Sequence, residues 1–163
     1  MTDKPIRALA EQVLARCRAK KLMLATAESC TGGMIAAALT DIAGSSDVVE
    51  RGFVTYSNRA KTELLGVPAG LIARTGAVSA EVAQAMAAGA LAHAPVDIAV
   101  AVTGIAGPGG GTPDKPVGLV HFGLARRGGA IRAEHHVFPG DRDAVRRATV
   151  ERALEMLLQI AEI

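Results

Sequence analysis

The chain has 163 residues, a formal net charge of +2, and 50% hydrophobic but only 2% aromatic residues. A chain of this length suits one domain with a real core. The small net charge is too weak to imply a nucleic-acid or membrane partner, and the scarcity of aromatic residues removes the stacking platforms on which single-stranded nucleic acids bind.

Along the chain, apolar periodicity predicts helices that alternate with strands. Helical spacing covers six segments: 5–20, 31–42, 58–65, 68–74, 80–93 and 141–161. Apolar runs typical of strands cover 22–27, 48–57, 97–103, 117–125 and 130–138. We expect Asn58, Ser79 and Asp141 to cap or open the helices that they begin. This order predicts one α/β domain over residues 1–163, a three-layer sandwich whose mixed, mostly parallel sheet ends in a β-hairpin.

The most informative segment is Ala27-Glu28-Ser29-Cys30-Thr31-Gly32-Gly33, between a predicted strand and a predicted helix. The Ser29 hydroxyl at such a junction is expected near backbone N–H groups that have no partner within the helix. These donors and the helix dipole favour negative charge, which suits a serine nucleophile. Two alternatives stay open: Ser29 caps the helix, or the adjacent Cys30 is the nucleophile, which would require an electropositive, partly open site.

A second segment, 104–116, follows the strand 97–103 and holds five glycines and three prolines. It matches neither the Walker pattern nor the dinucleotide fingerprint. Loops that follow strands are common ligand sites in α/β sheets, and glycines allow bare backbone amides to approach an anion or a carbonyl oxygen. Lys115 can add a positive charge. The alternative is an irregular surface loop.

A third segment contains Tyr56, near the end of a predicted strand, and Lys61, in the first turn of the next predicted helix. A lysine at such a position ordinarily lies in solvent, and a lone tyrosine is ordinarily a hydrogen-bonding core residue. Lysine can act as a general base only if burial or a neighbouring like charge lowers its pKa.

The histidines do not form a recognisable site. His135 and His136 are adjacent on a predicted strand, so their side chains should point to opposite faces and cannot share one metal. No His-Glu-x-x-His motif is present, and no histidine has a context that supports a Ser-His-Asp triad. We therefore expect no metal.

The remaining composition bears on location and anion binding. Cys17 and Cys30 have no metal-type spacing. The sequence shows no hydrophobic leader and no apolar run near the roughly 20 residues of a membrane span. Two cysteines in such a sequence predict a reduced, cytoplasmic protein. Basic residues gather late, at Arg142, Arg146 and Arg147, where they form either a local anion site or a solvated helix face.

Seven segments together resemble one known family. They read AESCTGG, DIAGSS, ERGFVTYSN with Lys61, TGAVS, VTGIAGPGGG, KPVG and FPGDRDAVR. In this order they are similar to the CinA C-terminal domain family, and in particular to its stand-alone amidase form. The resemblance extends from about residue 6 to residue 158. The molybdopterin-binding-like domain that precedes this one in full-length family members is not expected in a chain of this length.

The resemblance implies hydrolysis of the carboxamide of nicotinamide mononucleotide (NMN) to nicotinate mononucleotide and ammonia, by a Ser-Lys mechanism without metal or cofactor. Carried onto this sequence, Ser29 matches the nucleophile and Lys61 the general base. Tyr56 matches an auxiliary hydrogen-bonding residue, and Thr103 a position that lines the site.

For the remaining substrate contacts we expect three groups. The amides around Thr31, Gly32 and Gly33 should form the oxyanion hole. The loop 104–111 should frame the nucleotide. Its glycines in that role are Gly104, Gly107, Gly109 and Gly110. Arg142 or Lys115 should lie near the phosphate.

Two other functions compete with this interpretation. A non-catalytic nucleotide- or flavin-binding module would explain the glycine loop and the late arginines, but it leaves Ser29 and Lys61 without a task. A role in DNA uptake or damage response rests only on the family's historical name, and the charge and composition argue against direct DNA contact. The sequence does not fix the oligomeric state, and its Ala- and Gly-rich helices are compatible with a homodimer or larger homo-oligomer.

Overall fold

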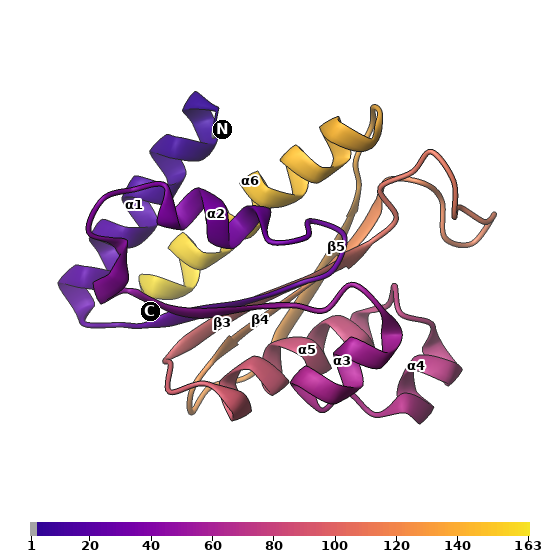
Figure 1. Ribbon diagram of the computed structural model, residues 1–163, viewed down its shortest axis with the longest axis horizontal. Coiled ribbons are helices and arrows are strands. Elements are labelled where there is room, and N and C mark those ends of the chain that lie inside the picture. The colour runs from indigo at the N-terminus through magenta and orange to yellow at the C-terminus, as the bar shows by residue number, and fades with distance from the viewer. Residues whose placement is uncertain (1–2) are drawn as a thin grey trace.

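A single five-stranded sheet divides the protein into layers (Figure 1). The computed structural model describes residues 3–163. The strands are β1 (Leu24–Glu28), β2 (Val49–Val54), β3 (Ile98–Gly104), β4 (Leu119–Arg126) and β5 (Arg132–Val137). Their order across the sheet is β2-β1-β3-β4-β5. The first three of these run parallel, and β4 and β5 form the antiparallel hairpin. The expected mixed, mostly parallel sheet ending in a hairpin is confirmed.

Helices cover both faces of this sheet (Figure 1). On one face lie α1 (Lys4–Lys20), α2 (Met34–Thr40) and α6 (Arg142–Ala161), and on the other α3 (Asn58–Leu65), α4 (Ala69–Thr75) and α5 (Ala80–His93). A short 3-10 turn, η1 (Ser45–Asp47), precedes β2. Each face has its own apolar cluster, one centred on α1 and α6 and the other on α5. The three-layer α/β sandwich is thus confirmed.

Small residues allow the second face to pack closely. A Cβ atom on Gly89 of α5 would lie 2.0 Å from the Leu65 carbonyl oxygen, and one on Gly123 of β4 would lie 2.2 Å from that of Ala83. No side chain fits at such distances, so α5 approaches both α3 and the sheet through bare backbone. These two glycines serve packing within the chain.

Three helix starts test the predicted caps. Ser79 and Asp141 cap α5 and α6 as expected, each accepting a backbone N–H in the first turn. The expected cap at Asn58 is wrong: the Ser57 hydroxyl accepts the Ala60 N–H at 3.0 Å, so Asn58 is the first residue of α3. The Ser57 backbone is extended while its side chain reaches forward, which is the usual geometry of an N-cap.

Helix α2 starts later than the periodicity predicts, at Met34 rather than at residue 31. Gly32 and Gly33 have φ angles of +57° and +105°, which right-handed helix does not allow. They form a turn between the end of β1 and the helix, and Ser29 lies at the beginning of that turn.

Two of the segments singled out in the sequence leave the sheet at the carboxyl ends of its parallel strands. Parallel pairing sets Glu28, the last residue of β1, opposite Val102 near the end of β3. The turn 29–33 and the loop 105–118 therefore begin side by side, at the strand ends where α/β sheets usually bind ligands. No helix among residues 3–163 is long and apolar enough to cross a bilayer.

Candidate active site

Ser29 and Lys61 meet at the carboxyl ends of the parallel strands. Lys61 Nζ lies 3.0 Å from Ser29 Oγ. Ser29 is positioned by the end of β1, where its N–H donates to the Val102 carbonyl at 3.1 Å. Lys61 reaches it from α3, whose start is fixed by the Ser57 cap. The structure therefore brings together the two residues that the sequence nominated as nucleophile and base.

Lys61 is buried, with only 1% of its surface exposed. Its Nζ contacts two carbonyl oxygens besides the Ser29 hydroxyl, that of Thr55 at 3.0 Å and that of Ser57 at 3.5 Å. Burial lowers the pKa of Lys61 below its ordinary value of 10.5, because desolvation disfavours the charged amine. The alternative of a solvated surface lysine is wrong.

The alternative in which Ser29 only caps α2 is also wrong. The residue at the N-cap position is Gly33, which has no side chain to offer. The Glu28 carboxylate instead accepts the N–H groups of Ile35 and Ala36, at 2.9 and 3.0 Å. Two orphan donors of the first turn are thereby satisfied without Ser29, whose hydroxyl is directed to Lys61.

A cleft of about 300 Å³ opens above the Ser29–Lys61 pair. Most of the predicted site residues line it. These are Ser29, Lys61, Tyr56, Thr103, Gly104, Gly107, Gly109, Gly110 and Arg142. Ile105 and Ala106, from the expected loop 104–111, line it as well, and so do Asn58, Ala77 and Val78, which the sequence did not assign to the site. We call this space the dyad cleft.

Four predicted residues do not line the dyad cleft: Thr31, Gly32, Gly33 and Lys115. The Gly32 N–H is engaged within the turn, where it donates to the Ser29 carbonyl at 3.0 Å. The Lys115 amine donates to the Thr75 carbonyl at 2.6 Å. Lys115 therefore fastens the glycine loop to the end of α4.

Cys30 lies next to Ser29 and also lines the dyad cleft. It is 7% exposed, and burial raises the pKa of its thiol from 9.0 to about 11. A thiolate is the reactive form of cysteine, so this site holds Cys30 in its inert form. The Lys61 amine contacts Ser29 Oγ, and the Cys30 thiol has a raised pKa, so Ser29 is the better candidate nucleophile.

Arg142 and Tyr56 close the outer end of the dyad cleft. Arg142 is the first residue of α6 and donates to the Gly107 carbonyl at 2.8 Å and to the Tyr56 hydroxyl at 3.0 Å. Tyr56 is 63% exposed, so it is not the core tyrosine that its type suggests. Arg142 also borders a neighbouring hollow of about 650 Å³ that Arg146 lines. A permanently charged guanidinium at a helix N-terminus is well suited to bind a phosphate group.

The other wall of the dyad cleft is fixed by Thr103. Its hydroxyl donates to the Ala77 carbonyl at 2.9 Å, which holds the segment before α5 against the end of β3. Gly104 follows at a point where a Cβ atom would lie 2.9 Å from the Leu119 carbonyl oxygen. The bare backbone of Gly104 therefore borders the cleft.

Two charged residues that the sequence did not assign to the nucleophile turn, Glu28 and Arg146, hold it in place. Glu28 is completely buried behind Ser29. Arg146 extends from α6 and donates to the carbonyls of Cys30 at 3.1 Å and Thr31 at 3.3 Å. A sequence signal existed for both, since Glu28 lies within the most informative segment and Arg146 one helical turn after Arg142.

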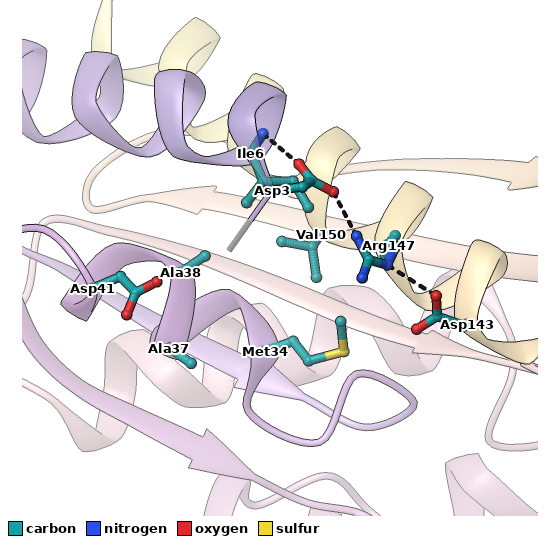
Figure 2. A pocket seen from close by; sticks show the side chains of 9 residues that line it. All are labelled: Asp3, Ile6, Met34, Ala37, Ala38, Asp41, Asp143, Arg147 and Val150. Atoms are coloured by element: carbon teal, nitrogen blue, oxygen red, sulfur yellow. Dashed lines mark hydrogen bonds and ion pairs between the residues drawn. The ribbon is translucent and has the colours of Figure 1, made fainter. Parts of the chain in front are cut away.

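A second pocket, of about 170 Å³, lies between α1, α2 and α6 (Figure 2). None of the predicted site residues lines it. Arg147 spans its rim and pairs with Asp3 and Asp143, both at 2.9 Å, while Asp3 also accepts the Ile6 N–H that it caps. These contacts tie the start of α1 to α6, so the pocket is a seam between helices.

The histidines are separated as predicted. His121 and His135 face each other on one side of the hairpin, with ring centroids 5.2 Å apart, whereas His136 stacks on Phe138 on the other side. Among residues 3–163, no group of three or more His, Cys, Asp or Glu side chains is arranged to hold a metal ion.

Comparison with known proteins adds the family. The family model of the CinA C-terminal domain matches residues 6–161. The nicotinamide-nucleotide amidohydrolase PncC of Escherichia coli K12 is 50% identical over 159 residues, covering 98% of this chain and 96% of that protein. A CinA-like protein of Akkermansia muciniphila is 53% identical over 150 residues, but the match covers only 36% of that longer protein.

Solved structures agree with the architecture. A competence/damage-inducible protein from Agrobacterium tumefaciens superposes with a TM-score of 0.96 at 49% identity, covering 98% of both chains. A CinA superfamily protein from Klebsiella pneumoniae gives a TM-score of 0.92 at 38% identity, covering 96% of this chain and 98% of that one. Because the family model matches nearly the whole length of this chain, the chain belongs to the CinA C-terminal domain family.

Proposed function

We propose that this protein is an amidohydrolase that converts NMN to nicotinate mononucleotide and ammonia, with Ser29 as nucleophile and Lys61 as general base. The observation that carries the mechanism is the 3.0 Å approach of a buried lysine to a serine at the floor of a cleft. The substrate is suggested by the amidohydrolase of E. coli, which is similar over 98% of this chain. We further propose that residues 1–163 form one amidase domain and that it works in the cytoplasm.

The surroundings of Lys61 Nζ suit a neutral amine. A neutral amine has two N–H donors and one lone pair. The carbonyls of Thr55 and Ser57 can take the two donors, because carbonyl oxygens only accept. The lone pair is then left for the hydroxyl proton of Ser29, which is the arrangement that general-base catalysis requires.

The reaction proceeds in two halves. Lys61 takes the Ser29 proton as Oγ attacks the carboxamide carbon, and the carbonyl oxygen becomes an oxyanion. The ammonium of Lys61 then returns the proton to the departing nitrogen, so ammonia leaves and an acyl-enzyme remains. Water, deprotonated by the same amine, attacks the ester and releases the carboxylate with Ser29 restored.

The outer cleft suits a nucleotide. With the nicotinamide ring above Ser29, the ribose would lie along the glycine loop and the phosphate near Arg142. The hollow beyond Arg142 leaves room there, and Arg146 adds a second positive charge. Thr31, Gly32, Gly33 and Lys115 lie outside the dyad cleft, so we propose Arg142, and not Lys115, as the phosphate contact.

Incubation of the purified protein with NMN, followed by measurement of ammonia and nicotinate mononucleotide, tests this function. We expect both products in equal amounts, without added metal or cofactor. Binding of NMN without release of either product would reject the amidase and favour a nucleotide- or flavin-binding module instead. Loss of turnover in Ser29→Ala, with binding retained, separates the mechanism from mere occupancy of the cleft.

A further inference from the structure

Glu28 is a completely buried acid directly before the nucleophile. Its carboxylate accepts three hydrogen bonds, from the Thr31 hydroxyl at 2.6 Å and from the N–H groups of Ile35 at 2.9 Å and Ala36 at 3.0 Å. Burying a carboxylate is costly unless hydrogen bonds replace its hydration. Here all three donors come from the turn that follows Ser29 and from the first turn of α2.

This contact replaces an ordinary helix cap. An N-cap side chain usually accepts the N–H of the second or third helical residue, but the N-cap of α2 is Gly33. Glu28 supplies the missing acceptor from the end of β1, and the positive end of the α2 dipole favours its charge. The strand end and the helix start are thereby joined through one side chain, with Ser29 between them.

The backbone of Glu28 continues the same support toward the base. Its carbonyl accepts the Thr55 N–H at 2.8 Å. The Thr55 carbonyl in turn accepts from Lys61 Nζ at 3.0 Å. One residue therefore fixes the turn that carries the nucleophile and, through Thr55, the acceptor that orients the base.

We propose that Glu28 is a positioning residue for the reaction, which keeps Ser29 Oγ within reach of Lys61 by holding the nucleophile turn against α2. The proposal rests on the proposed function only in taking Ser29 as the nucleophile. Arg146 holds the opposite side of the same turn through the Cys30 and Thr31 carbonyls. Both sides of the turn are thus held, which fixes the backbone that carries Ser29 relative to α2 and α6.

Glu28→Gln is the sharpest variant, because it preserves shape and removes one acceptor oxygen. The new amide group must turn its NH2 either toward the Ala36 N–H or toward the Ile35 N–H and Thr31 hydroxyl, so donor faces donor. A displacement of about 1 Å near the reacting atoms costs about 100-fold in rate. We therefore expect kcat to fall about 10- to 100-fold for Glu28→Gln, with KM for NMN unchanged, since the residues that line the cleft remain.

The matched control is Thr149→Val. Thr149 is as buried as Glu28, and its hydroxyl donates to the Val145 carbonyl at 2.7 Å, within α6 and outside the dyad cleft. This variant also loses a buried hydrogen bond and should unfold more easily. Its rate per folded molecule should equal that of the wild type, which separates positioning from general destabilisation.

Reactivity of Ser29 can be measured without NMN by using a fluorophosphonate probe. Ser29 Oγ forms a bond to phosphorus, fluoride leaves, and the hydroxyl proton passes to Lys61. Mass spectrometry gives the rate constant for modification of Ser29, and the final labelled fraction counts the folded sites. We expect Glu28→Gln to slow this step by a factor similar to its loss in kcat, while Thr149→Val reacts at the wild-type rate.

The outcomes separate this proposal from the function itself. A wild-type protein that is labelled at Ser29 but releases no ammonia from NMN refutes the substrate, while the labelling rates still test Glu28. Labelling of Glu28→Gln at the wild-type rate overturns the positioning role, and so does a wild-type protein that is not labelled at Ser29. If Glu28→Gln does not fold, Thr31→Val, which removes one of the three donors, decides: it must react more slowly than wild type.

Discussion

Ser29 Oγ and Lys61 Nζ lie 3.0 Å apart, although 32 positions separate them in the chain. Ser29 follows β1, and Lys61 lies on α3. In the chain, α2, η1 and β2 lie between these two elements. Lys61 is buried, and this burial lowers the pKa of its amine in the absence of substrate. The resting fold therefore already holds the pair at the distance that the proposed nucleophile and base require.

Replacing Ser29 with alanine removes the proposed nucleophile. We expect NMN hydrolysis to fall by roughly a million-fold, the scale measured when a serine hydrolase loses its nucleophile. Cys30→Ala should keep a large part of the activity, because the Cys30 thiol has a pKa of about 11 and stays protonated. Ammonia release by the two variants checks this, and the reverse pattern would move the nucleophile to Cys30.

The pH dependence of the rate tests Lys61 as the base. Since only the neutral amine can accept a proton and its pKa is lowered by burial, kcat/KM should rise with pH and level off above the lowered pKa. Lys61→Arg keeps a cation that does not deprotonate in proteins, so it should be nearly inactive at every pH. A flat profile across neutral pH in the wild type would contradict this role.

Lys61 should also reduce the stability of the fold at neutral pH. Its native pKa is lower than the unfolded value of 10.5, so between these two values the unfolded chain binds the extra proton and the free energy of unfolding rises with pH. Lys61→Met keeps an unbranched side chain, one atom shorter, and removes the amine, so it should unfold at a higher temperature at pH 7. Each 1 kcal/mol gained raises Tm by about 2–4 °C.

Calorimetry over a pH series measures this difference. The wild type, measured at each pH, is the reference for the variant. The advantage of Lys61→Met should shrink as the pH approaches 10.5. An advantage that is constant with pH would show that packing, and not the buried amine, separates the two proteins.

Arg142 should discriminate in favour of a phosphorylated substrate. Removing a hydrogen bond to a charged group costs about 1.5–3 kcal/mol, which corresponds to about 10- to 150-fold in binding. We expect Arg142→Ala to raise KM for NMN by that factor and to leave the weak hydrolysis of nicotinamide riboside, which has no phosphate, unchanged. Arg147→Ala is the matched control, since Arg147 lies on the same helix but faces the pocket of Figure 2.

One ion pair bears on stability alone. Arg152 of α6 donates to both carboxylate oxygens of Glu134 on β5, at 2.6 and 2.9 Å. This pairing lowers the pKa of Glu134 from 4.5 to about 2, and a hydrogen bond with His136 adds to it. The stabilisation is therefore complete above pH 4.5 and is lost as the pH falls through about 2.

Glu134→Gln should lower the free energy of unfolding at pH 7 by roughly 1 kcal/mol, the upper range for partly exposed pairs. Thermal unfolding at several pH values tests this. The difference from wild type should vanish near pH 2, and NMN hydrolysis at pH 7 should be unaffected, because Glu134 lies on the hairpin away from the dyad cleft. Persistence of the difference at low pH would assign it to packing.

The sequence by itself determined the layers and the hairpin, and it named most of the residues that line the dyad cleft. Alternating periodicity and glycine stops are local properties, so the order of helices and strands follows from them. The seven motifs also nominated Ser29, Lys61, Tyr56 and Arg142, because family motifs preserve the residue types that a reaction needs.

Tertiary structure alone decided three matters. Lys61 is buried because β2 and α3 bring it under the end of β1, a long-range arrangement that no local pattern encodes. Ser57 replaced Asn58 as the cap, since both residue types suit that position and only the backbone selects one. An acid before a helix ordinarily faces solvent, so no local pattern indicated that Glu28 is buried. Its burial follows from the tertiary structure, in which this residue ends β1 while its carboxylate accepts N–H groups from the start of α2.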